Sequence, residues 1–304
     1  MIFDTGLAVA AMFGDSLTIP WPRGSAPPSA APPVGLLAGS GRFPIVFAEK
    51  ARHLGLRVVC VGIRHEASPD LAPLVERFYW AGVSKLGRII RCFRRERVQR
   101  IVMAGKVSKS VMYTPWRVLQ LWPDFRTCRF WFRQWKKDFK DDSLMLGIIN
   151  EFRRDGMDFD SALNVCPELL VKPGLLTRRG PSRGEEQDID FGWELAKEMG
   201  RLDVGQSVAV KERAVLAVEA IEGTDRAILR AGELCPMGGF TVVKVAKPQQ
   251  DMRFDVPTIG PQTMENLHKA GGRVLAIEAH KTIVLDHAET IALANRYAIT
   301  ILAR

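Results

Sequence analysis

Residues 34–63 read VGLLAGSGRFPIVFAEKARHLGLRVVCVGI, and this stretch decides the fold. Residues 34–39 are an apolar run that ends in glycine, which predicts a buried strand. Residues 43–55 place apolar side chains at helical spacing, and residues 56–63 form a second apolar run. A strand, a glycine turn, a helix and a second strand make a βαβ unit, which predicts a parallel sheet.

The same alternation continues along the chain. Residues 78–82 and 98–105 predict two more strands, with a helix over 84–96 between them. We therefore expect a Rossmann-like open parallel sheet in the first half. In the second half, two apolar runs (207–212 and 214–222) are separated only by a tight turn, so the sheet there is expected to be mixed.

The expected fold class is α/β, with two α/β domains. Residues 34–166 form the N-terminal Rossmann-like domain, and residues 167–304 form a C-terminal mixed α/β domain that carries the catalytic groups. The boundary falls near Cys166 because the next residues, to 190, are rich in Pro, Gly and charge. Residues 1–33 end in a Pro- and Ala-rich stretch, which predicts a disordered arm outside both domains.

Composition excludes several classes of protein. Hydrophobic residues make up 47% of the 304 residues and charged residues 25%, which excludes a disordered chain or a fibre. The five cysteines are widely spaced and form no C-x-x-C, so neither a disulfide framework nor a cysteine zinc site is expected. No apolar run reaches the about 18 residues that span a bilayer, and the start of the chain lacks a signal-peptide pattern. We expect a cytoplasmic protein.

Positive charge is concentrated in one segment. The net charge is +9, and residues 84–140 alone hold 16 Lys and Arg against three Asp and Glu. Many Trp and Phe residues accompany these cations, which predicts a basic amphipathic helix over 125–140. Its aromatic stripe packs on the core in one interpretation and touches lipid head groups in another. Nucleic-acid binding is a third interpretation, and no nucleic-acid motif supports it.

A glycine turn follows the first predicted strand. Gly39, Ser40, Gly41 and Arg42 lie where a helix begins, and the free N–H groups there favour an anion. The alternative is a plain strand-to-helix turn. Lys106 follows the fourth predicted strand and is expected to face the same crevice, unless it is a solvated loop lysine.

Two stretches in the second half combine carboxylates and cations at strand ends. Residues 219–225 (EAIEGTD) place Glu222 after a strand and Thr224 and Asp225 at a helix start. Such oxygen ligands suit Mg²⁺, although Thr224 and Asp225 could also simply cap the helix. Residues 244–255 (KVAKPQQDMRFD) add two Lys, one Arg and two Asp, which are the groups that phosphoryl transfer needs.

Several motifs in one order resemble a known family. They are GLLAGSGRFP (35–44), VMAGKVSK (102–109), DDSLM (141–145), PELLVKPGLLTRR (167–179), DIDFGWELAKEMGRLDVGQSV (188–208), VLAVEAIEGTD (215–225), VVKVAKPQQDMRFDVPTIGP (242–261) and EAHKT (278–282). From Val34 to the C-terminus, the sequence is similar to the LpxI-type UDP-2,3-diacylglucosamine pyrophosphatases of lipid A biosynthesis. It departs from them in the arm of residues 1–33, in an enlarged aromatic-basic segment, and at His280, where the family more often has glycine.

The resemblance implies a reaction and a site. The reaction is Mg²⁺-dependent hydrolysis of UDP-2,3-diacylglucosamine to 2,3-diacylglucosamine 1-phosphate (lipid X) and UMP, with the substrate between the domains. Asp225 is implied to hold Mg²⁺ or to activate water, and Glu222, Asp251 and Asp255 are further catalytic or metal candidates. Substrate contacts are expected from the glycine turn and from Thr224, Lys106, Arg178, Gln206, Lys244, Lys247 and Arg253.

The expected partners follow from this substrate. The glycolipid lies in the inner leaflet of the inner membrane, so the basic and aromatic segment is expected to bring the protein to that surface. We also expect a homodimer and no nucleic-acid partner. The alternative function is a nucleotide-sugar-binding protein without hydrolytic activity, which would need neither Asp225 nor Mg²⁺.

Overall fold

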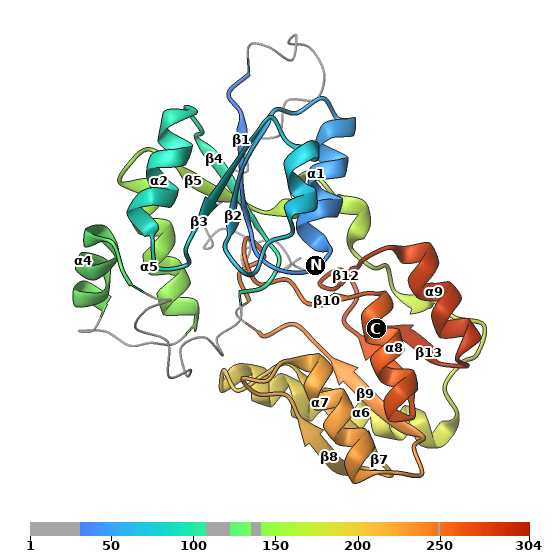
Figure 1. Cartoon of the computed structure of the whole chain (residues 1–304). Helices are drawn as coiled ribbons and strands as arrows, with labels where there is room; N and C mark the ends of the chain where they lie inside the picture. The colour runs from blue at the N-terminus through green and yellow to red at the C-terminus, as the bar shows by residue number, and fades with distance from the viewer. Residues whose placement is uncertain (1–30, 108–121, 135–140, 249) are drawn as a thin grey trace, which may run out of the picture.

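The computed structural model describes residues 31–107, 122–134, 141–248 and 250–304, which fold into two α/β domains (Figure 1). The expected arm therefore lies outside the described residues, apart from its last three positions. The α/β fold class and the two-domain layout are confirmed.

The first domain is built on a five-stranded sheet in the order β3-β2-β1-β4-β5, and every pairing is parallel. Its strands are β1 (Val34–Ala38), β2 (Val58–Ile63), β3 (Arg77–Ala81), β4 (Arg100–Ala104) and β5 (Asp158–Asp160). Its helices are α1 (Phe43–His53), α2 (Leu86–Arg95), α4 (Phe125–Gln134) and α5 (Asp141–Arg153), with short 3₁₀ turns at Pro69–Leu74, Ala162–Asn164 and Pro167–Leu169.

Helices cover both faces of this sheet, as a parallel sheet requires. All six residues of β2 are buried, and they alternate between the two faces. Cys60 packs with Phe47 of α1, whereas Val59 and Val61 pack with α2 and α5 on the opposite face (Figure 1). Burial of each large side chain such as Phe47 contributes about 2 kcal/mol, so this two-sided core fixes the strand order.

The second domain has a six-stranded sheet in the order β6-β13-β11-β9-β7-β8. Its strands are β6 (Gly174–Leu175), β7 (Ser207–Lys211), β8 (Ala214–Val218), β9 (Phe240–Lys244), β11 (Gly272–Ile277) and β13 (Thr300–Ala303). β9, β11 and β13 are parallel, while β7 is antiparallel to both β9 and β8. The predicted mixed sheet is thus confirmed, and the tight turn between β7 and β8 is a hairpin.

Helices also cover both faces of the second sheet (Figure 1). They are α6 (Arg183–Arg201), α7 (Thr224–Leu234), α8 (Pro261–Ala270) and α9 (His287–Arg296). Apolar residues of α6 form one core, and those of α7, α8 and α9 form the other. α6 begins at Arg183, inside the stretch up to 190 that the sequence analysis assigned to the domain junction. Ser182 and Glu185 form a capping box there, which starts the helix in a polar sequence.

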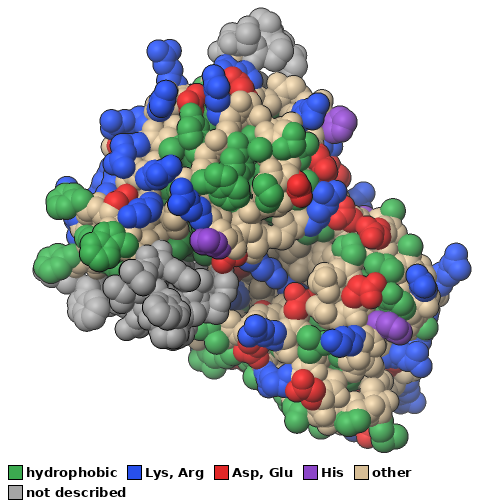
Figure 2. Space-filling view, in the orientation of Figure 1, with side chains coloured by type: hydrophobic (Ala, Val, Ile, Leu, Met, Phe, Trp, Pro, Cys, Tyr) green, Lys and Arg blue, Asp and Glu red, His purple; other side chains and the backbone are tan. Residues whose placement is uncertain are grey.

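The two domains touch through a small third sheet, in which β10 (Thr258–Ile259) pairs with β12 (Ile283–Val284). Ile283 and Leu285 belong to the core of the first domain although they come late in the chain. The Ser161 hydroxyl also donates to the Met252 carbonyl across the junction, at 2.8 Å. Figure 2 shows the surface hollowed between the two domains.

None of the helices in the described part of the chain combines the length and the apolar character that a bilayer-crossing helix needs.

Candidate functional site

The loops that follow β1 and β4 are bonded to each other. The Ser40 N–H donates to the Lys106 carbonyl at 2.7 Å, and the Lys106 N–H donates to the Ser40 carbonyl at 3.0 Å. The Ser40 hydroxyl donates to the same Lys106 carbonyl at 2.8 Å. β1 and β4 are the neighbours at which the strand order reverses, and open α/β sheets bind ligands outside such a switch point. The glycine turn and Lys106 therefore lie together at the expected ligand edge.

Glycine is required for this close approach. A Cβ atom on Gly39 would lie 2.4 Å from the Lys106 carbonyl oxygen, and one on Gly105 would lie 2.6 Å from the Ser40 carbonyl oxygen. Gly41 and Gly105 also have φ angles of 96° and 88°, which side-chain-bearing residues rarely adopt. The turn residues are thus fixed by the backbone geometry of the two loops.

Arg42 faces the second domain. Its guanidinium lies 3.3 Å from the Asp286 carboxylate, just before α9, and 3.5 Å from Glu49 on α1. The candidate substrate contact at Arg42 therefore lies where the domains meet, and its charge is shared with two carboxylates.

The matching edge of the second domain is set by strand register. Ser207 pairs with Lys244 where β7 begins and β9 ends. The Glu219 N–H, just after β8, donates to the Ser207 carbonyl at 2.8 Å. Because β8 and β9 both run antiparallel to β7, their carboxyl ends meet on either side of the amino end of β7. Ser207, Glu219 and Lys244 therefore lie side by side.

α7 begins over this edge. The Lys244 ammonium donates to the Thr224 hydroxyl at 3.1 Å and to the Thr258 carbonyl at 2.9 Å. The Ser207 and Thr224 hydroxyls lie 3.3 Å apart. Thr224, the first residue of α7, is thus held from below by a buried lysine, and Asp225 follows it in the first turn.

Four charged side chains from both domains act electrostatically on the buried Lys244, and with Lys244 we call them the charge cluster: Lys106, Glu219, Asp225, Lys244 and Asp255. Burial lowers the pKa of Lys244, which is only 2% exposed; the charges of Glu219, Asp225 and Asp255 counteract this, and the charge of Lys106 adds to it. Lys106 belongs to the first domain, so its charge acts on Lys244 across the junction of the two domains.

Asp225 and Lys106 are the accessible members of the charge cluster. Asp225 is half-buried and Lys106 is exposed. Among the described residues, neither side chain makes a hydrogen bond or an ion pair. A carboxylate in the first turn of a helix is favoured by the helix dipole, which explains why Asp225 is tolerated without a partner.

Other carboxylates predicted from sequence are paired with cations. Glu222 forms an ion pair with Arg230 of α7, and Asp251 forms one with Arg253. Burial works to raise the pKa of Glu222, but its own backbone N–H and Arg230 outweigh burial and lower the pKa. Glu222 and Asp251 are not members of the charge cluster around Lys244. Their proposed metal and catalytic roles stay predictions.

The remaining candidates are distributed around the cluster. Lys247 forms an ion pair with Asp203. The Gln206 carbonyl accepts from the Val245 N–H at 3.0 Å, next to the end of β9. Arg178 is exposed, and its backbone N–H donates to the Asn295 side chain of α9 at 2.8 Å. This contact places Arg178 with α9 rather than with the charge cluster.

The charge cluster is compatible with a magnesium site in which the substrate supplies some of the ligands. Within residues 31–107, 122–134, 141–248 and 250–304, no group of three or more His, Cys, Asp and Glu side chains is arranged to hold a metal ion. Mg²⁺ however takes only one or two carboxylates when substrate phosphates and water supply the other ligands. Asp225 and Asp255 offer carboxylates of this kind beside Lys244.

Glu219 is the first residue of the stretch 219–225 in which the sequence analysis found oxygen ligands that suit Mg²⁺, but the metal and catalytic roles were assigned to Glu222 and Asp225. The Glu219 side chain is buried, with 7% of the residue exposed, and in the described structure its Oε2 atom has no hydrogen-bond partner. The sequence signal was weak, because Glu219 stands alone between Val218 and Ala220 at the end of an apolar run. Only the register of β7, β8 and β9 shows that it lies beside Lys244.

A second surface lies on the first domain, and we call it the basic-aromatic surface. Trp122, Phe125, Trp131 and Phe132 are 65%, 83%, 38% and 73% exposed, and Cys128 is exposed among them. Figure 2 shows Lys and Arg side chains gathered over α2, beside the hydrophobic side chains of this region. Exposed arginines of α2 and α4 complete it: Arg88, Arg91, Arg94, Arg95, Arg129 and Arg133.

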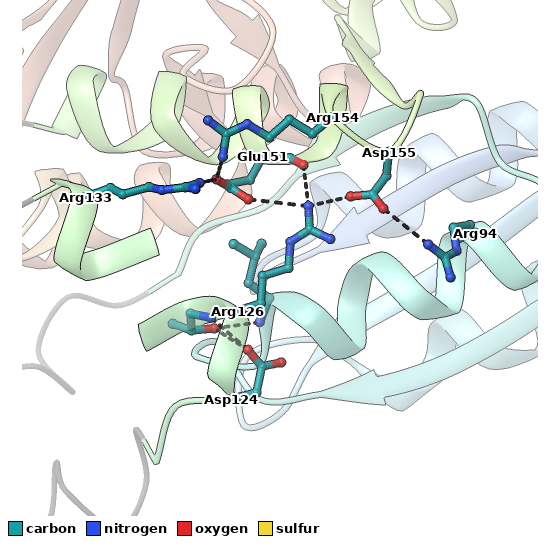
Figure 3. Close-up of polar contacts among 9 residues, drawn as sticks. Arg94, Asp124, Arg126, Arg133, Glu151, Arg154 and Asp155 are labelled. Carbon is teal, nitrogen blue, oxygen red and sulfur yellow. Dashed lines mark hydrogen bonds and ion pairs between the residues drawn. The ribbon is translucent and has the colours of Figure 1, made fainter. Parts of the chain in front are cut away.

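Charged side chains fix α4 in place (Figure 3). The Arg126 guanidinium donates to the Glu151 carbonyl at 2.8 Å and also pairs with Asp155 of the next turn, and Arg133 pairs with the Glu151 carboxylate at 3.2 Å. Asp124 accepts from the Arg88 N–H at 3.0 Å, which ties the start of α4 to α2. The fold thus fastens a helix on which three aromatic residues, Phe125, Trp131 and Phe132, are exposed.

The interpretation in which the aromatic stripe of α4 packs on the core is only partly confirmed. Phe130 is 5% exposed and packs against the core, but Phe125 and Phe132 do not. The predicted helix over 125–140 is observed over Phe125–Gln134, and residues 135–140 lie outside the described residues. A cavity of about 290 Å³ between α2 and α4 is lined partly by Arg91, Arg94 and Phe125.

Comparison with known proteins agrees with the two-domain layout. Residues 33–169 match the family model of the LpxI N-terminal domain, and residues 172–302 match that of the LpxI C-terminal domain. The chain therefore belongs to the LpxI family, which confirms the resemblance. The UDP-2,3-diacylglucosamine pyrophosphatase LpxI of Caulobacter vibrioides is 31% identical over 281 residues, covering 88% of this chain and 96% of the relative.

Proposed function

We propose that this chain is a hydrolase that cleaves the pyrophosphate of UDP-2,3-diacylglucosamine to 2,3-diacylglucosamine 1-phosphate and UMP, in lipid A synthesis. The observation that carries the proposal is the meeting of Lys106 with Asp225 and Lys244 across the two domains. The name of the 31% identical Caulobacter relative supports the choice of substrate.

The glycine turn and the lysines bind the pyrophosphate. The turn opens α1, and the positive end of the helix dipole favours an anion there. Pro44 has no N–H and the Ile45 N–H donates to the Arg42 carbonyl, so the N–H groups of the turn itself are the ones that face an anion. Lys106 is exposed and contacts the phosphates directly, whereas buried Lys244 adds positive charge from beneath Thr224. Charge held in place before the reaction stabilises the transition state more than mobile solvent does.

Mg²⁺ is part of this proposal. Asp225 would hold the ion, with Asp255 facing the same charge cluster. When bound, Mg²⁺ supplies Lewis-acid polarisation of a phosphoryl oxygen. Asp225 is suited to this role because it is half-buried and has no partner among the described residues.

The direct test is ³¹P NMR of the purified chain with UDP-2,3-diacylglucosamine. We expect UMP and lipid X with Mg²⁺, none with EDTA, and none with Asp225→Asn. Binding of the substrate without turnover by well-folded wild type would instead support the alternative, a nucleotide-sugar-binding protein.

We also propose that the basic-aromatic surface binds the anionic membrane in which such a glycolipid resides. Exposed aromatic residues flanked by arginines suit the boundary of an anionic bilayer, and salt weakens that attachment. α4 packs at the start of α2, which follows β3, so the surface lies toward the same carboxyl edge of the sheet as the glycine turn.

Vesicle sedimentation tests the membrane proposal. Trp122→Ser/Phe125→Ser should reduce binding to vesicles of 30% phosphatidylglycerol in phosphatidylcholine about tenfold. The control is Leu234→Ser/Met237→Ser, which removes two exposed apolar residues of the second domain and should bind like wild type. Equal binding of all three proteins contradicts the proposal. The expected homodimer stays a prediction, which sedimentation equilibrium tests.

A further inference from the structure

Glu219 is a buried carboxylate for which the described protein provides no hydrogen bond at Oε2. Leaving an acidic oxygen buried without a partner is costly, so native proteins keep such groups mainly where a ligand, an ion or a reaction uses them. The position is enforced from both sides: the Glu219 N–H donates to Ser207, and a Cβ on Gly205 would lie 2.1 Å from the Glu219 carbonyl oxygen.

The Lys244 ammonium makes no direct hydrogen bond to the Glu219 carboxylate. The Lys244 ammonium donates to the Thr224 hydroxyl and to the Thr258 carbonyl. The strand register nevertheless places Glu219 beside Ser207 and Lys244. The side chains of Ser207 and Lys244 both reach the Thr224 hydroxyl, next to Asp225. The Glu219 carboxylate therefore faces the charge cluster and retains an unused oxygen there.

The charge cluster points to a cation. It contains three acidic side chains and two lysines, one of which is buried. A pyrophosphate adds further negative charge to the same place. A divalent cation between the carboxylates and the phosphates removes this repulsion, and Mg²⁺ takes carboxylates and phosphates together.

A neighbouring buried glutamate shows the contrast. Glu278 follows β11 at the same edge of the sheet and is 9% exposed. Its carboxylate accepts from Lys197 at 2.6 Å and from the Ala246 N–H at 2.8 Å. The Glu278 carboxylate thus receives hydrogen bonds from the protein, whereas Glu219 is similarly buried and its Oε2 atom receives none from the described residues. Glu222, in the same loop as Glu219, is engaged by Arg230.

We propose that Glu219 is the second carboxylate that binds the divalent cation of this site, together with Asp225. The inference rests on the proposed function for the identity of the phosphate-bearing ligand. In this arrangement Glu219, and not Glu222, is the second carboxylate beside Asp225 at the cation.

The test is titration of the full-length chain with Mn²⁺ in the presence of UMP, with free Mn²⁺ measured by electron paramagnetic resonance. Glu219→Gln preserves the shape of the side chain and removes the anionic oxygen. We expect it to weaken Mn²⁺ binding at least tenfold, as Asp225→Asn should. The control Glu278→Gln should stay within threefold of wild type although it lowers the melting temperature.

Glu219→Asp guards against a folding defect in the Gln variant, because it keeps the charge beside Lys244. The shorter side chain should shift the Mn²⁺ affinity while circular dichroism remains that of wild type. Wild-type affinity in both Glu219 variants overturns the inference, and so does a loss that appears in Glu222→Gln instead.

Turnover measured on the same samples separates this inference from the proposed function. Hydrolysis by wild type with unchanged metal binding in the Glu219 variants would overturn the inference alone. Glu219-dependent Mn²⁺ binding without hydrolysis would overturn the proposed reaction and leave the inference standing.

Discussion

Ser40 and Lys106 lie 66 positions apart in the chain, yet their main chains exchange two hydrogen bonds. The exchange joins the loops after β1 and β4, which makes the phosphate-binding turn and its lysine one rigid unit. A rigid unit positions charge before the substrate arrives, so its geometry is expected to control substrate affinity.

Gly39→Ala should disturb this unit. The added Cβ would lie 2.4 Å from the Lys106 carbonyl oxygen, and neither backbone can move without breaking the Ser40–Lys106 pairing. We expect a loss of about 1–3 kcal/mol of stability and a raised KM. Urea unfolding and steady-state kinetics measure the two effects. Gly184→Ala is the control, because nothing lies within 4 Å of its added Cβ; equal behaviour of the two variants would contradict the account.

Lys106→Gln should weaken substrate binding without weakening the fold. Lys106 is exposed and has no ion pair among the described residues, so its removal costs the folded protein little. Loss of a charge-assisted contact to phosphate should raise KM about 10- to 100-fold. Lys50→Gln, which removes an exposed pair with Glu168, should leave both KM and melting temperature near wild type. An unchanged KM for Lys106→Gln would remove this residue from the site.

His280→Gly should stabilise the protein. His280 has a φ of 59°, in the left-handed region that favours glycine. Relief of strain, less the added freedom of the unfolded chain, should yield about 0.5 kcal/mol. His280→Ala keeps the Cβ and hence the strain, so it should show no gain. Urea midpoints of the three proteins decide the matter.

Glu278→Gln should show a pH-dependent loss of stability. Burial works to raise the pKa of Glu278, but Lys197, Lys281 and the Ala246 N–H outweigh burial and lower it. A carboxyl whose pKa is lower in the folded state stabilises that state above its unfolded pKa, near 4.5, and loses this contribution as the pH falls through the folded value. At pH 7 the variant should be less stable by about 2 kcal/mol. The gap should narrow as the pH falls below 4.5 and through the lowered pKa of Glu278, and a gap of constant size would contradict the assignment.

The sheets could be predicted because their strands are buried on both faces. Continuous apolar runs such as Val58–Ile63 are typical of parallel strands under two layers of helices, and they were found from sequence. β5 was not found, because Asp158–Asp160 offers one apolar residue and depends on β4 for its position. The start of α6 was missed because Arg183 to Asp190 lack apolar periodicity, and only the Ser182–Glu185 capping box indicates it.

The candidate site was predictable where residues adjoin in sequence and not where register brings them together. The glycine turn, Lys106 and Asp225 follow from strand ends, and the structure places them in one region. The position of Glu219 beside Lys244 depends on β7 lying antiparallel between β8 and β9, and no local sequence pattern indicates that arrangement. Conversely, Glu222 and Asp251 resemble free ligands in the sequence, and only the fold shows their arginine partners.

The outward-facing helix α4 also provides a natural attachment point for a reporter. Cys60 and Cys166 are buried, and burial raises the pKa of both thiols, that of Cys166 to about 12. Cys128 is exposed on α4, between the aromatic residues of the basic-aromatic surface. An environment-sensitive dye placed by thiol chemistry should therefore favour Cys128. The fluorescence of that dye, on a protein without any substitution, can then show in real time whether this face enters a lipid layer during turnover.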